Sequence, residues 1–175
     1  MNRNHEFLIP PYSTKSIIKM GALAGLAGGL AEVGWICLLS ATGQVSAVAV
    51  AKGVTAAIAP SLATHSFGIV MGLGFHLAIA MALGAVMLVL WARLFSVSFS
   101  KWWGASFALV TLATVWAVNF HVVLPVLSPQ FLDLVPQGLG LVSKLLFALA
   151  LLGTLYAIGR FQPKTDHSNN ILKGD

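Results

Sequence analysis

The sequence predicts an all-α, polytopic membrane protein: four transmembrane helices, with short interfacial helices in the two outer loops. Hydrophobic residues make up 58% of its 175 residues and charged residues only 9%, about a third of the charged fraction of soluble domains. The 10 basic and 5 acidic side chains are too few to cover a small soluble domain. The apolar stretches are continuous and do not alternate as the strands of a membrane barrel do. We therefore expect one membrane domain over 1–175.

Each predicted span has the roughly 20 apolar residues that a helix needs to cross the hydrocarbon core. The spans lie at about 17–39, 67–90, 103–123 and 139–159, and the polar tails at 1–15 and 160–175. A cleaved secretory signal is a poor alternative for the first span, because the apolar part of such signals is only about 7–15 residues long.

The basic residues predict the orientation. Eight of the ten Lys and Arg residues fall in the tails or between the second and third spans, and they are Arg3, Lys15, Lys19, Arg93, Lys101, Arg160, Lys164 and Lys173. Basic residues in short loops favour the cytoplasmic side, so we expect both termini to be cytoplasmic. Trp91, Trp102 and Trp103 fall at the same boundary, where tryptophan anchors in the headgroup region.

The first outer connection, 41–65, carries Val50, Val54 and Ile58 at helical spacing. This pattern predicts a short helix on the outer leaflet, ended by Pro60.

In the second outer connection, 124–138, Ser128 followed by Pro129 fits an N-cap with proline at the first helical position. We expect one interfacial turn there, ending near Leu134. Both hairpins then have the same form, and 76–84 looks like 144–153, so a parallel duplication is an open alternative.

Four ionisable side chains interrupt the spans, all in the outer half, and they are Glu32, His76, His121 and Lys144. Ionisable groups inside spans usually face other helices or a cavity. We therefore expect a polar cluster between the helices. Lys144 has the alternative of snorkelling to the outer surface along its long stem, and His121, close to the end of its span, that of an interfacial histidine.

Small residues share faces with three of these side chains. Such stripes let helices approach closely in lipid, where no hydrophobic force drives helices together. The glycines predicted to pack helices are Gly21, Gly25, Gly28, Gly29, Gly68, Gly72 and Gly84. Gly140 and Ala148 bracket Lys144, while Ala113, Thr114 and Ala117 form a weaker face leading to His121.

The polar cluster has several chemical interpretations. Glu32 could pair with Lys144 or hydrogen-bond to His76 and hold the bundle in register. His76, His121 and Glu32, with His65 as a further candidate, could bind a transition metal, and His76 with His121 could hold haem b. The depths of the two histidines differ by about 10 Å at the helical rise, which disfavours a shared iron. Glu32 and His76 could also form a proton relay in a transport component.

The sequence favours a non-enzymatic role. It lacks zinc-type His spacings, a phosphate loop and a dinucleotide fingerprint, and Cys37 has the surroundings of a packing cysteine. The split basic residues do not suit nucleic acid. We expect a small accessory or scaffold subunit of a membrane assembly or homo-oligomer, whose partners are the bilayer and either other membrane subunits or itself. A cofactor is not specified; metal or haem binding is the alternative function and proton-coupled transport a further one.

Three segments, GLAEVGW at 29–35, VAKGVTAAIAP at 50–60 and GLGFHLAIAMALG at 72–84, form a recognisable pattern. Over about residues 20–90 the chain is similar to small, uncharacterised four-span bacterial membrane proteins. The resemblance implies a four-helix architecture and a bacterial inner-membrane location, and it implies no functional residues.

Overall fold

The computed structural model describes residues 13–94 and 101–160, and its regular structure there is helical throughout. Three long helices are α1 (Thr14–Ala41), α3 (Gly68–Leu94) and α7 (Gln137–Arg160). A fourth rod joins α4 (Lys101–Val118), the π-helix η2 (Asn119–Val123) and α5 (Leu124–Leu127). All four are long and apolar enough to cross a membrane, so the predicted fold class is confirmed. The parts of the predicted tails at 1–12 and 161–175 lie outside the described residues.

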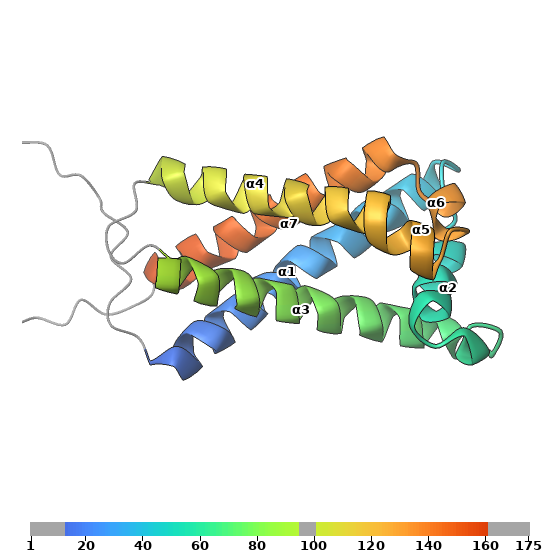
Figure 1. Cartoon of the computed structure of the whole chain (residues 1–175), viewed down its shortest axis with the longest axis horizontal. Helices are drawn as coiled ribbons and strands as arrows, with labels where there is room; N and C mark the ends of the chain where they lie inside the picture. The colour runs from blue at the N-terminus through green and yellow to red at the C-terminus, as the bar shows by residue number, and fades with distance from the viewer. Residues whose placement is uncertain (1–12, 95–100, 161–175) are drawn as a thin grey trace, which may run out of the picture.

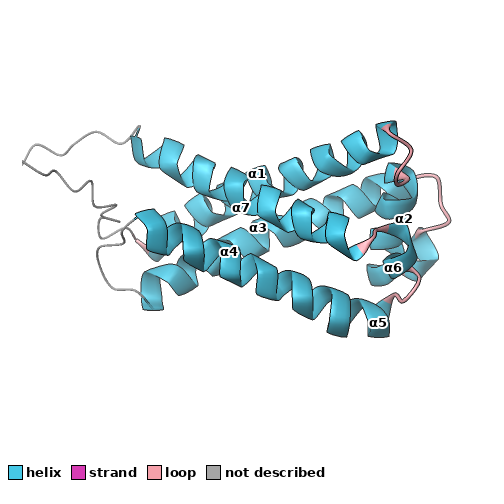
Figure 2. Cartoon of the chain, turned by 90° about the horizontal axis from the view of Figure 1, so that it is seen from above, coloured by secondary structure: helices cyan, strands magenta, loops and turns pink. Residues whose placement is uncertain are grey.

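The four long helices form a bundle with two different ends (Figure 1). α1 packs against α3 on one side and α7 on the other, and α4 packs against α7. One end, called the α2 end below, carries α2 (Ala47–Ile58) and α6 (Phe131–Leu134); the other carries the start of α1 and the end of α7. Figure 2 shows that the long helices cross one another at an angle, so close contact between any two is local.

Glycines bring the backbones of α1 and α3 into contact. A Cβ atom on Gly21 would lie 2.6 Å from the carbonyl oxygen of Gly84, and one on Gly25 would overlap the carbonyl of Ala80. A Cβ on Gly29 would lie 2.6 Å from the Cβ of Ala80. These positions therefore have no room for any side chain, and the small residues let the two backbones approach closely.

The glycines of α3 contact two different helices. Gly84, in the second half of α3, touches α1, whereas Gly72, near the start of α3, packs against the backbone of Ala51 in α2. Gly68 packs against the loop that includes the short helix η1 (Pro60–Leu62). A Cβ atom on Gly68 would lie 2.9 Å from the carbonyl oxygen of Leu62. Close packing at this end thus fixes the first loop as well as a span.

The predicted loop helix in the first connection is confirmed as α2. Ser46 caps its start by accepting a hydrogen bond from the Ala49 amide at 3.2 Å, and Pro60 follows its end. Thr55, fully buried, donates a hydrogen bond to the carbonyl of Gly68 at 2.6 Å. This bond ties α2 to the beginning of α3.

The second connection differs from the prediction. The third span does not end near residue 123 but continues as helix to Leu127, through Pro125. Ser128 ends α5 rather than capping the next helix, and Gln130 precedes α6, with no side-chain cap. The physical reason is the π-helix just before Pro125: the Leu124 amide donates to Asn119, five residues back, and a widened turn accommodates a proline that lacks an N–H.

Candidate functional site

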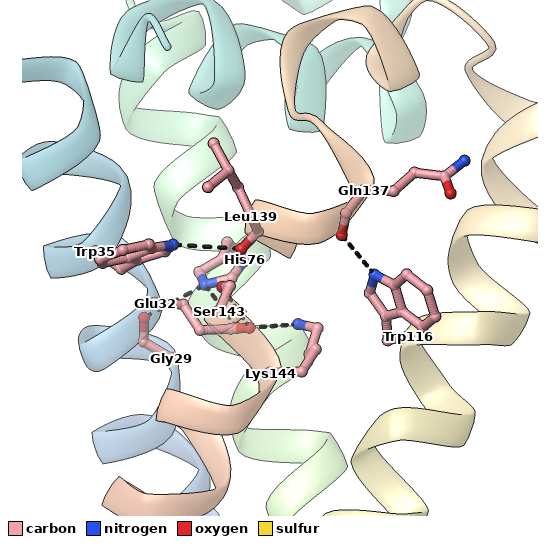
Figure 3. Close-up of polar contacts among 9 residues, drawn as sticks. All are labelled: Gly29, Glu32, Trp35, His76, Trp116, Gln137, Leu139, Ser143 and Lys144. Carbon is pink, nitrogen blue, oxygen red and sulfur yellow. Dashed lines mark hydrogen bonds and ion pairs between the residues drawn. The ribbon is translucent and has the colours of Figure 1, made fainter. Parts of the chain in front are cut away.

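The carboxylate of Glu32 is the centre of a polar cluster that joins α1, α3 and α7 (Figure 3). The residue is only 3% exposed. One carboxylate oxygen, Oε1, accepts a hydrogen bond from the ammonium of Lys144 at 2.5 Å and another from the hydroxyl of Ser143 at 3.0 Å. The other oxygen, Oε2, lies 3.5 Å from Nε2 of His76. Below we call Glu32, His76, Ser143 and Lys144 the Glu32 cluster.

The glycines one turn before Glu32 determine which helices reach it. Gly28 faces the ring of Phe147 on α7, and Gly29 faces Ala80 on α3. Because both neighbours come close to α1 at this level, side chains from either helix can contact a glutamate one turn further on. The same small residues that pack the helices thus position the cluster.

His76 makes two contacts through one ring nitrogen. Nε2 lies 3.4 Å from the carbonyl oxygen of Gly29 and 3.5 Å from the Glu32 carboxylate. A carbonyl only accepts hydrogen bonds, so we assign the ring hydrogen to Nε2. In this tautomer His76 links α3 to the backbone of α1 as a donor.

Lys144 turns inward instead of snorkelling to the surface. Its ammonium pairs with Glu32 and lies 5.8 Å from the centre of the Phe147 ring. An ion pair in a low-dielectric setting offsets part of the cost of removing both charges from water. Pairing across α1 and α7 is therefore the better arrangement for this lysine.

Two tryptophans bind the start of α7, and sequence reasoning missed both. Trp35 donates to the carbonyl of Leu139 at 3.3 Å, and Trp116 donates to that of Gln137 at 3.2 Å (Figure 3). The sequence spacing does hint at one of them, since Trp35 follows Glu32 by three residues and shares its face. Ser143 was missed too, although it immediately precedes Lys144. Together these bonds hold α7 at the height where its lysine meets Glu32.

The structure does not bring His121 to the other predicted site residues. His121 is exposed in the π-helix, and its ring packs edge-on against Trp116, with 5.7 Å between ring centres. The prediction continued the face of Ala117 by four residues, but a π-turn takes more residues than an α-turn and rotates the following side chains away from that face.

The predicted metal ligands are likewise not assembled. His65 stacks on Phe67 in the first loop, with 5.2 Å between ring centres. Within residues 13–94 and 101–160, no three His, Cys, Asp or Glu side chains are placed to hold a metal ion. Glu32 and His76 meet, but His121 does not join them as a third metal ligand.

Comparison of the chain with protein-family models, with curated proteins and with solved structures gave no match.

Proposed function

We propose that the chain is a small accessory or scaffold subunit of a membrane assembly or homo-oligomer, acting through the outer surfaces of its helices. One observation carries the proposal: the Glu32 carboxylate takes its ion-pair partner, Lys144, and its hydroxyl donor, Ser143, from the chain itself. A buried charge compensated in this way specifies how helices pack, and it does not need a substrate to complete it.

The outward faces of the spans support the same role. Val70 on α3, Val110 on α4 and Leu149 on α7 are large apolar residues that are more than half exposed. Such faces suit lipid and the helices of neighbouring subunits equally well.

Charge reversal tests whether assembly depends on the bundle that Glu32 specifies. The tagged full-length chain is extracted from its own cell membranes in polymer-bounded lipid discs, and native mass spectrometry gives the stoichiometry of the particle. We expect a fixed stoichiometry above one chain, lost in Glu32→Lys and regained when Lys144→Glu is added. Thr114→Val is the matched control, because this exposed hydroxyl donates to the carbonyl of Val110 within α4.

Two results would refute the scaffold proposal. One is a particle of a single chain at every concentration. The other is a haem absorption band or a stoichiometric metal in the purified particle that disappears in His76→Ala, because the cluster would then serve a cofactor.

We further propose that the protein resides in a bacterial inner membrane with both termini in the cytoplasm. Lys15 and Lys19 begin α1, and Arg93 is in the last turn of α3, all at the end of the bundle opposite α2. Lys52 is on α2. This asymmetry supports a cytoplasmic placement of the basic end. A reporter enzyme fused after Asp175 should be active only in the cytoplasm, and activity in the periplasm would reverse the orientation.

A further inference from the structure

One side of α1 combines a basic beginning with an apolar continuation. Lys15 and Lys19 lie one turn apart near the start of the helix, and both are exposed. Further along on the same side, Leu23 is 55% exposed and Leu30 52%. We propose that this side of α1 binds one anionic phospholipid, with the phosphate at the two lysines and the acyl chains along the two leucines. The proposal concerns a single chain, so it does not depend on the scaffold role.

The packing contacts of α1 leave this side of the helix uncovered. Gly21 contacts α3, and Gly28 contacts the ring of Phe147 on α7. Lys19 precedes Gly21 by two residues, which is about 200° around an α-helix with 3.6 residues per turn. The lysine therefore points away from α3, and Leu23 lies on the same side one turn later.

The described part of the chain does not neutralise Lys15 and Lys19. Its acidic residues are Glu32, which pairs with Lys144, and Asp133, which lies on α6 at the opposite end of the bundle (Figure 1). Like charges one turn apart on a helix repel each other. The helix dipole also disfavours a cation in the first turn, and the first turn of α1 has no acidic residue. A phosphate placed between the two ammonium groups relieves both effects.

The dimensions of this side match one leaflet of a bilayer. Lys15 and Leu30 are 15 residues apart, which is about 22 Å at the helical rise. One headgroup layer and half of the hydrocarbon core together measure about 20–22 Å. Lysine extends its ammonium toward the headgroups along a long stem, so the deeper Lys19 can reach the level of Lys15. A phospholipid whose phosphate lies there covers the leucines with its acyl chains.

Lipid titration followed by native mass spectrometry tests the proposal on the full-length chain in detergent, where orientation in a membrane plays no part. The wild type should bind dioleoyl phosphatidylglycerol more tightly than dioleoyl phosphatidylcholine, which carries no net charge. Phosphatidylglycerol with hexanoyl chains should bind more weakly, because its short chains do not cover the leucines. Lys15→Gln and Lys19→Gln should each weaken dioleoyl phosphatidylglycerol binding about fivefold, and together about 25-fold, as expected for basic groups near an anionic surface.

The matched control removes the same charge from the segment that follows α7, as Lys164→Gln with Lys173→Gln. This variant should bind phosphatidylglycerol as the wild type does. An equal loss in the two double variants would overturn the proposal, because net charge rather than one side of α1 would then attract the lipid. Unchanged binding in Lys15→Gln with Lys19→Gln would overturn it as well. So would equal binding of phosphatidylglycerol and phosphatidylcholine, or of the oleoyl and hexanoyl lipids.

Discussion

The two interfaces of α1 differ in what touches across them. Toward α3, backbone meets backbone, because Gly21 and Gly25 lie against Gly84 and Ala80. Toward α7, side chains fill the space: the buried ring of Phe147 covers Gly28, and Lys144 reaches Glu32. The first interface is therefore sensitive to added volume, with His76 as its polar contact to Gly29 and Glu32. The second depends on the Glu32–Lys144 charge pair and on side chains that can be replaced together.

The largest effect is expected at the charge pair. Lys144→Met leaves the Glu32 carboxylate without its cation and should lower the free energy of unfolding by about 3–5 kcal/mol, the usual cost of breaking a buried pair. Adding Glu32→Gln should recover most of that loss, because neither side chain is then charged. Unfolding equilibria in lipid bicelles measure both values. A double variant no more stable than Lys144→Met would show that the α1–α7 interface does not depend on the charge pair.

The next effect is expected on the α3 side. Gly84→Ala places a methyl group against the backbone of Gly21 and Gly25 and should cost about 1–3 kcal/mol, as overpacking does. The control is Gly74→Ala on the same helix, where a Cβ has nothing within 4 Å. Equal stabilities of the two variants in the bicelle measurement would show that α1 and α3 are not in backbone contact.

A smaller and repairable effect is expected at Gly28. Gly28→Ala meets the ring of Phe147 at 2.8 Å and should cost about 1 kcal/mol, at the low end for overpacking. Phe147→Leu in the same chain should return part of this loss, and a double-mutant cycle measures the coupling. No such second change should rescue Gly84→Ala, since the obstacle there is backbone. Additive losses at Gly28 and Phe147 would show that the side chain of Phe147 is not what limits the volume at Gly28.

The smallest effect is expected at the start of α7. Trp116→Phe keeps an aromatic ring but removes the hydrogen bond to Gln137, which should cost about 0.5–1.5 kcal/mol. Hydrogen exchange should report faster opening of the first turn of α7, with the exchange of α3 unchanged. Faster exchange in α3 as well would mean that the two sides of α1 are not independent.

The sequence predicted what depends on hydropathy and on spacing within one helix. The four spans and the loop helix ending before Pro60 are of this kind. So is the position of Glu32, His76 and Lys144, each on a face of its own helix that small residues share. It did not predict features that depend on the backbone of another segment. The π-turn before Pro125 carried His121 away from the cluster, and the tryptophan donors bind carbonyl groups, which every residue has and no spacing distinguishes.

The meeting of His76 and Lys144 at one carboxylate has a consequence for how the chain is made. These residues begin the two similar segments, 76–84 and 144–153, one in each hairpin, yet both depend on Glu32. Lys144 is synthesised 112 residues after the acid that it neutralises. An ionisable group without its partner is costly in a bilayer. The first hairpin is therefore fully synthesised long before the cation that pairs with Glu32 is available. Its final packing must therefore wait for the last helix to enter the membrane, and a chain that stops before α7 should not reach it.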